Sequence, residues 1–301
     1  MEKFYSNGKL LITGEYCVLD GAKAFALPTR FGQSLEVCPL DKPVIIWESF
    51  SVLKELWFQA ELKTNELDVP NENPMIATLQ KILLEAQKMN SKFLGEENGA
   101  FVQTFLSFPN EWGLGTSSTL INNIASWAKV DAFQLLQKSF GGSGYDIACA
   151  QNNAPIYYTR GNQSPIVSPV KFDPSFKENL FFVYLNKKQN SKDGIESYRS
   201  LKKDKEKVIE KISKISEKIT SSKTLEEFEN YIELHEILIS DLLEIPTVKE
   251  NLFSDYFGKV KSLGAWGGDF VLVTGNENTP EYFENKGYDI VLDYQGMILN
   301  N

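Results

Sequence analysis

One stretch, residues 101 to 128, constrains the fold of this chain more than any other. An apolar, β-prone run from Phe101 to Phe108 is followed by the turn Pro109-Asn110-Glu111-Trp112-Gly113-Leu114-Gly115-Thr116-Ser117-Ser118. Apolar residues then recur with the spacing of one helix face, at Leu120, Ile121, Ile124, Trp127 and Ala128. The pattern predicts a strand, a turn rich in glycine and hydroxyl groups, and a helix.

This order of elements suits a bound polyphosphate. Glycines let the backbone approach a ligand closely, and the N–H groups at a helix start meet anionic oxygens with the helix dipole behind them. Ser117 or Ser118 would then supply a hydroxyl ligand to magnesium, although the sequence contains no G-x-x-x-x-G-K-[ST] motif. The alternative is an ordinary turn in which Ser or Thr caps the helix, and the stretch alone leaves both interpretations open.

Length and charge narrow the classes of protein. With 301 residues, the chain is long enough for one large domain or two of ordinary size. A net charge of −9 argues against nucleic acid as the main partner. No apolar run approaches the length of a membrane span, so we expect a cytoplasmic protein without a membrane partner. The three cysteines have no paired spacing that would indicate a disulfide framework or a zinc site, and no feature indicates an oligomeric state.

The chain has one histidine, His235. Mechanisms that need several histidine ligands, or a histidine base beside a nucleophile, are therefore not expected. The apolar neighbours of His235 follow a helical spacing, so we predict a structural role for it.

The first twenty residues contain two charged residues in an otherwise β-like stretch, Lys9 and Glu15. We expect short strands on both sides of Gly14-Glu15-Tyr16, the second over Cys17-Val18-Leu19, and a tight turn at Asp20-Gly21. Lys9 is either an edge-strand residue that discourages aggregation or a residue that reaches into a site.

Three further features lie later in the chain. Asp146 follows the glycine-rich run Gly141-Gly142-Ser143-Gly144-Tyr145, either as a helix cap or as a general base. A segment rich in Pro, Ser, Asn and Gly at residues 161 to 178 predicts a domain boundary, and residues 200 to 243 predict two long amphipathic helices. Lys187, Lys188 and Lys192 form either a solvated loop or a collar for an anionic substrate.

The glycine-rich stretches occur in an order that resembles the motifs of the GHMP kinase superfamily, which includes galactokinase and the homoserine, mevalonate and phosphomevalonate kinases. The first motif is matched by Gly8-Lys9-Leu10 through Gly14-Glu15-Tyr16. The second, P-x-x-x-G-L-G-S-S, is matched by Pro109 with Gly113 to Ser117, where Thr116 replaces the first serine. The third, a G-A-G-G-G loop, is matched by Gly264-Ala265-Trp266-Gly267-Gly268.

The resemblance implies an α+β fold of two domains. Residues 1–170 would form an N-terminal ATP-binding domain of the ribosomal protein S5 domain 2-like kind, and residues 171–301 a C-terminal ferredoxin-like domain. It also implies an ATP- and Mg2+-dependent transfer to a small anionic substrate, with Asp146 as the catalytic carboxylate and Lys9 as the cation that keeps it ionised.

Roles for the remaining motif residues follow from the same resemblance. The ATP phosphates would be held by Pro109, Gly113, Leu114, Gly115, Thr116, Ser117 and Ser118, with Ser117 near the magnesium ion. The substrate would be contacted by Glu15, Tyr16, Ser143, Gly144, Gly264, Ala265, Gly267 and Gly268. Lys187 and Lys188, which belong to no motif, would join these contacts if they form the collar.

Details within the motifs are most similar to those of phosphomevalonate kinases, with mevalonate kinases next. Gly14-Glu15-Tyr16 resembles their G-E-Y, and Gly144-Tyr145-Asp146-Ile147-Ala148 resembles the GYDIA-type subgroup. Alternatives are a diphosphomevalonate decarboxylase from the same superfamily and a non-catalytic relative that binds a ligand. Two departures bear on these alternatives: Trp266 places a large ring in the third loop, and residues 127 to 141 contain no glutamate for magnesium.

Overall fold

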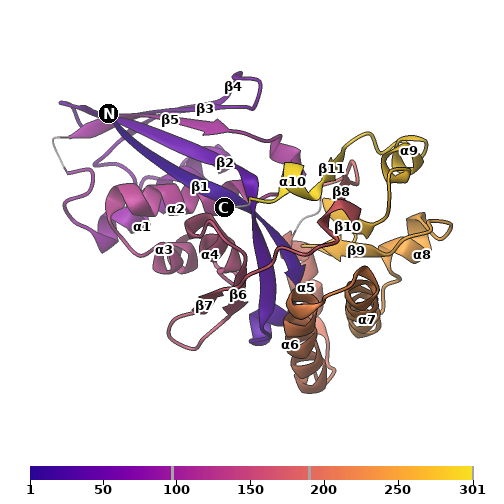
Figure 1. Cartoon of the computed structure of the whole chain (residues 1–301). Coiled ribbons are helices and arrows are strands. Elements are labelled where there is room, and N and C mark those ends of the chain that lie inside the picture. The colour runs from indigo at the N-terminus through magenta and orange to yellow at the C-terminus, as the bar shows by residue number, and fades with distance from the viewer. Residues whose placement is uncertain (96–97, 189–190, 300–301) are drawn as a thin grey trace. The chain divides into compact units, whose positions relative to one another are not determined.

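The computed structural model describes residues 1–95, 98–188 and 191–299 (Figure 1). They form two units that interleave along the chain. The first unit contains Met1–Gly8, Phe31–Asn110 and Leu114–Gln151, and the second contains Lys9–Arg30, Glu111–Gly113 and Asn152–Asn301. The division falls inside strands β1 (Glu2–Thr13) and β2 (Ala24–Leu40), which therefore contribute to both units. A boundary between consecutive domains at residues 170 and 171 stays a prediction.

The first unit is a sheet covered by helices. Its strands follow the order β4-β3-β5-β2, in which only β3 and β5 run parallel. Trp47, Leu83 and Ile121 belong to one core cluster that joins the sheet to the helices. Besides parts of β1 and β2, the elements are β3 (Val44–Phe50), β4 (Leu56–Lys63), α1 (Pro74–Met89), β5 (Gly99–Leu106), α2 (Thr116–Ala128), α3 (Ala132–Ser139) and α4 (Tyr145–Gln151).

The second unit contains a four-stranded antiparallel sheet of order β11-β8-β10-β9, together with the antiparallel strands β2, β6 and β7. Its strands are β6 (Ile156–Thr159), β7 (Ile166–Pro169), β8 (Leu180–Tyr184), β9 (Val260–Leu263), β10 (Phe270–Thr274) and β11 (Val291–Asp293). Its helices are α5 (Ser191–Ser200), α6 (Glu206–Ser221), α7 (Leu225–Leu243), α8 (Val248–Leu252), α9 (Thr279–Glu284) and α10 (Tyr294–Met297), with short 3-10 turns η1 (Cys17–Asp20) and η3 (Lys177–Asn179); a third turn, η2 (Asn110–Trp112), is divided between the units.

Most of the predicted elements are present. The strand β5 and the helix α2 flank the glycine-rich turn as expected, and α6 and α7 are the two amphipathic helices of residues 200 to 243. Asp131 caps α3 by accepting the N–H of Gln134 at 2.7 Å. Among the described residues, no helix combines the length and the apolar character that crossing a bilayer requires.

The strand predicted over Cys17-Val18-Leu19 is wrong, because these residues form the 3-10 turn η1. Tyr16 begins the turn with φ of 57°, and Gly21 ends it with φ of 91°. Two residues with positive φ on either side of a short apolar segment close it into a turn, so the segment cannot extend as a strand.

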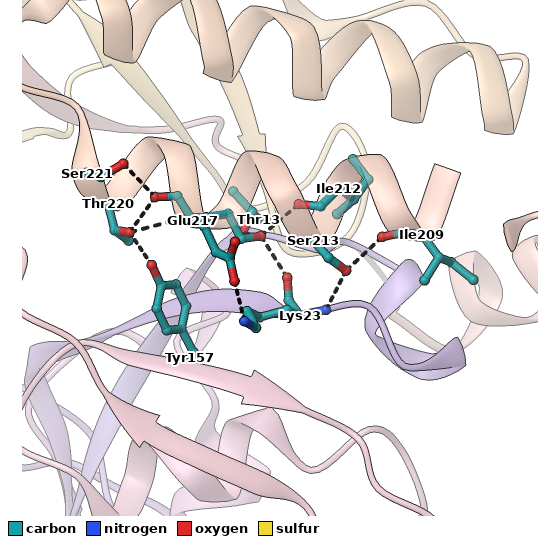
Figure 2. Close-up of polar contacts among 10 residues, drawn as sticks. Thr13, Lys23, Tyr157, Ile209, Ile212, Ser213, Glu217, Thr220 and Ser221 are labelled. Atoms are coloured by element: carbon teal, nitrogen blue, oxygen red, sulfur yellow. Dashed lines mark hydrogen bonds and ion pairs between the residues drawn. The ribbon is translucent and has the colours of Figure 1, made fainter. Parts of the chain in front are cut away.

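Helix α6 holds the chain on both sides of this turn (Figure 2). The hydroxyls of Ser216 and Thr13 are 2.6 Å apart, and Ser216 also donates to the carbonyl of Lys23 at 2.7 Å. The N–H of Lys23 donates to Ser213 Oγ at 3.0 Å, and the Lys23 ammonium pairs with Glu217. The residues on both sides of Gly14-Glu15-Tyr16 are therefore fixed to one helix.

Candidate active site

Helix α2 begins at a turn that provides no side-chain cap. Gly115 is the N-cap residue in the left-handed conformation, with φ of 98° and ψ of 38°, and no side chain accepts a hydrogen bond there. The hydroxyl of Ser118 instead donates to the carbonyl of Gly115 at 2.8 Å. Capping by Ser or Thr, the alternative interpretation of this stretch, is therefore wrong.

The two candidate magnesium ligands differ in their surroundings. Ser118 is buried, and its hydroxyl is bonded to the main chain. Ser117 is exposed on the first turn of α2. Of the two hydroxyls, only that of Ser117 is placed to meet a ligand from solvent.

The first motif meets the second at Lys9. This lysine is half-buried, and its ammonium donates to the carbonyl of Gly113 at 3.1 Å. Gly113 has φ of 65°, and a Cβ atom added to it would lie 1.9 Å from Oδ2 of Asp269. Asp269 directly follows the third motif, and Lys9, Gly113 and Asp269 all belong to the second unit.

Trp266 does not present its ring to a ligand. Its side chain is buried in a cluster with Tyr16 and Tyr198, and its indole N–H donates to the carbonyl of Pro246 at 3.2 Å. Its main-chain N–H donates to the hydroxyl of Tyr16 at 2.9 Å. The indole ring of Trp266 therefore points into the protein interior and anchors the third loop there.

Glu15 and Tyr16 lie in the interior, where a substrate does not reach them. Glu15 is fully buried, and its carboxylate accepts from the Lys261 ammonium at 2.8 Å. Tyr16 is buried by stacking on Tyr198, with ring centroids 5.7 Å apart. Their burial argues against the predicted direct contacts with substrate. His235 is also fully buried, which confirms its structural role.

Asp146 is the second residue of α4, so it lies inside the helix rather than before it as a cap. The preceding loop is shaped by glycines with positive φ, at Gly141, Gly142 and Gly144. Ser143 is buried and Asp146 is half-buried. Asp146 belongs to the first unit and Lys9 to the second, so an ion pair between them stays a prediction.

The remaining predicted substrate contacts differ in exposure. Lys187 and Lys188 are exposed beyond the end of β8, while the side chain of Lys192 lies outside the described residues. In the third loop, Gly264, Ala265 and Gly267 are half-buried and Gly268 is buried. Positive φ values of 75° at Gly264 and 68° at Gly267 explain why this loop needs glycine there.

The sequence is not matched by any family model or by any curated protein. Solved structures match along the whole chain. The mevalonate kinase of Methanococcus jannaschii superposes with a TM-score of 0.73 at 17% identity, over 100% of this chain and 98% of that one. The chain has the GHMP kinase fold.

Two other solved structures with the GHMP kinase fold match over similar lengths. The phosphomevalonate kinase of Streptococcus pneumoniae, in complex with phosphomevalonate and AMPPNP, has a TM-score of 0.70 at 15% identity, over 100% of this chain and 99% of that one. The galactokinase of Lactococcus lactis, complexed with galactose, has a TM-score of 0.70 at 13% identity, over 99% and 95%. The predicted two-domain α+β GHMP kinase fold is confirmed, and the GYDIA-type subgroup stays a prediction.

The motifs did not point to two residues that the GHMP kinase fold places among them. Asp269 directly follows the third motif and has no predicted role, although its carboxylate packs against Gly113. Lys261 received no role, although it is fully buried against Glu15. The available signal for Lys261 is its place beside the apolar residue Val260 in a short strand, which is unusual for a lysine. A lysine that is fully buried needs a carboxylate partner.

Proposed function

We propose that this protein is an ATP-dependent small-molecule kinase that phosphorylates phosphomevalonate or mevalonate. The observation that carries the proposal is the start of α2, where left-handed Gly115 stands in the place of a capping side chain. A helix start without a side-chain cap offers its N–H groups to anionic oxygens. The GHMP kinase fold, shared along the whole chain with a phosphomevalonate kinase complexed with AMPPNP, supports ATP as the anionic ligand.

Phosphoryl transfer depends mainly on positioning and on neutralising charge. The turn from Gly113 to Ser118 would bind the ATP phosphates, and Pro109 would set the entry to that turn. Lys9 would fix the turn through the Gly113 carbonyl, which it already contacts. Asp146, presented by the glycine-rich loop before α4, would orient the acceptor oxygen and take up its proton.

The residues present fit a magnesium ion that is held chiefly by the nucleotide. Among the described residues, no cluster of three His, Cys, Asp or Glu side chains forms a metal site. Ser117 offers one exposed hydroxyl, and magnesium readily keeps several water ligands. The ion would neutralise charge on the β- and γ-phosphate oxygens.

The acceptor is the finer part of the proposal. Lys187 and Lys188 are two exposed cations in a chain of net charge −9, placed directly after β8. They would attract a substrate that carries a carboxylate and a phosphate, which favours phosphomevalonate over mevalonate. The third loop would contribute backbone contacts through Gly264, Ala265, Gly267 and Gly268.

A coupled assay of ADP release tests the proposal. The protein is offered mevalonate, phosphomevalonate, homoserine and galactose, and we expect turnover with phosphomevalonate or mevalonate. Asp146→Asn should lower turnover by about 10² or more and leave ATP affinity nearly unchanged, because it removes the charge but keeps the size.

The matched control is Asp131→Asn, because Asn caps a helix about as well as Asp does. This variant should retain full turnover. Release of carbon dioxide from diphosphomevalonate would instead identify a decarboxylase. ATP binding without ADP release from any acceptor would identify a non-catalytic relative.

A further inference from the structure

Four ionisable side chains meet in the interior of the second unit, under the turn Gly14-Glu15-Tyr16. Lys261 of β9 donates to Glu15 at 2.8 Å and to Glu236 of α7 at 3.2 Å. The Nε2 atom of His235, also on α7, lies 3.1 Å from the second carboxyl oxygen of Glu15. The side chains of Glu15, His235 and Lys261 have no exposed surface, and that of Glu236 has 4%.

The hydrogen bond from Gly14 fixes the state of the histidine. The main-chain N–H of Gly14 donates to Nε2 of His235 at 3.0 Å. Nε2 must therefore carry its lone pair, and the hydrogen of a neutral ring is on Nδ1, which is buried and has no hydrogen-bond partner among the described residues. Burial, followed by the charge of Lys261, lowers the pKa of His235 well below its usual value, which agrees with a neutral ring.

The contact between His235 and Glu15 then requires a hydrogen. If Glu15 were ionised, Oε2 and Nε2 would face each other at 3.1 Å as two acceptors in a buried site. A hydrogen on Oε2, directed at Nε2, removes this repulsion, and Nε2 then shares its single lone pair between this hydrogen and the N–H of Gly14. The other carboxyl oxygen, Oε1, still accepts from Lys261.

The charges around Glu15 agree with a protonated carboxyl group. One ammonium, Lys261, faces two carboxyl groups, Glu15 and Glu236, so a single proton makes the cluster neutral. Burial raises the pKa of Glu15 to about 7, against the pull of Lys261 and with a further rise from Glu236. In the part of the chain that the structure describes, Tyr16 and Cys17 are the other titratable groups that face Glu15, and burial raises the pKa of both, so they stay neutral at pH 7.

We propose that Glu15 holds a structural proton on Oε2, and that this proton positions the first and third glycine motifs together. The turn that carries Glu15 also carries Tyr16, whose hydroxyl accepts from the N–H of Trp266 in the third loop. Thr13, just before the turn, is held by α6 (Figure 2). When Glu15 loses this proton, Oε2 and Nε2 repel each other. The turn from Gly14 to Tyr16 must then move, and the hydrogen bond from Trp266 to Tyr16 is disturbed with it.

The chain contains a site-specific probe for this proton, because His235 is its one histidine. Protein labelled with 15N in histidine gives NMR signals from that ring alone. We expect the neutral Nδ1–H form from pH 5 to pH 9, with a step in the Nε2 shift as Glu15 loses its proton near pH 7. A ring protonated at Nε2, or titration as an ordinary imidazolium, would overturn the proposal.

Thermal unfolding supplies a second test that needs no activity. A carboxyl group whose pKa is raised on folding stabilises the protein fully below its unfolded value, and this stability is lost as pH rises through the folded value. The side chain of Glu15→Gln cannot titrate, so only the wild type loses this stability as pH rises. The Tm of Glu15→Gln minus the Tm of the wild type should therefore increase by several degrees between pH 5 and pH 8.

The matched control is Glu66→Gln, because Glu66 is exposed and paired with Lys63 at 2.8 Å. Its Tm relative to wild type should stay constant over the same pH range. Hydrogen exchange, corrected for the intrinsic pH dependence, should also speed up at Gly14 and Trp266 of the wild type above pH 7. A Tm difference between Glu15→Gln and wild type that does not change with pH would refute the proposal, and the histidine spectrum decides the matter if Glu15→Gln does not fold.

Discussion

At Gly113 the main chain has no room for a side chain. The glycine has φ of 65°, and an added Cβ would lie 1.9 Å from a carboxylate oxygen of Asp269. We expect Gly113→Ala to lower the free energy of unfolding by more than about 2 kcal/mol, because left-handed strain is added to the displacement of Asp269. Chemical denaturation measures the change.

Gly141 separates these two effects, because it has φ of 76° and no atom within 4 Å of an added Cβ. Gly141→Ala should therefore cost only the left-handed strain, about 1–2 kcal/mol. Equal losses in the two variants would show that Asp269 does not crowd Gly113.

The sequence identified the motif residues but not how deeply they are buried. Glu15 and Tyr16 matched a motif that suggested contact with substrate, yet both face inward and act on other parts of the protein. A pattern of residue types cannot distinguish the two sides of a turn. The partners of Glu15 are 220 to 246 positions away in the chain, and no local signal reports such distant contacts.

At the scale of single elements, helix ends are where local sequence and observed structure agree best. An Asp directly before an amphipathic segment is typical of a helix N-cap, and Asp131 does cap α3. We expect Asp131→Ala to destabilise the protein by about 0.5–2 kcal/mol, because the N–H of Gln134 loses its acceptor. The measurement is urea denaturation, and a loss as large in Asp131→Asn would mean that capping is not the cause.

Elements with strong periodicity, such as α6 and α7, were predictable because apolar residues recur in their sequences with the spacing of one helix face. The turn η1 was not, because its three apolar residues Cys17, Val18 and Leu19 are equally typical of a buried strand. Its conformation depends on Tyr16 adopting a positive φ, which few non-glycine residues do.

For the whole molecule, the interleaving of the two units along the chain predicts that the C-terminal half does not fold alone, whereas two consecutive domains would predict that it does. The apolar cluster around Trp266 and Ile239 includes Tyr16, Cys17 and Leu19 from the start of the chain. We expect a fragment of residues 171–301 to be unfolded, because it also leaves buried Lys261 without Glu15. The dispersion of its amide NMR signals, compared with those of the full chain, measures this.

Adding a fragment of residues 1–170 to that sample should restore dispersed signals. A fragment 171–301 that folds alone would instead support a domain boundary at residue 170, and would show that the early residues are dispensable to it.

The distant partners of Glu15 also have a consequence for how the protein is made. A ribosome adds about 5–20 residues each second, so the 246 positions between Glu15 and Lys261 take roughly 10 to 50 seconds to synthesise. All segments of the first unit have been synthesised by residue 151, long before Lys261 exists. Tyr16, Cys17 and Leu19 belong to a cluster whose distant members run from Tyr198 to Trp266, so their side chains are synthesised long before these partners. A chaperone that binds nascent chains would find a long-lived target there.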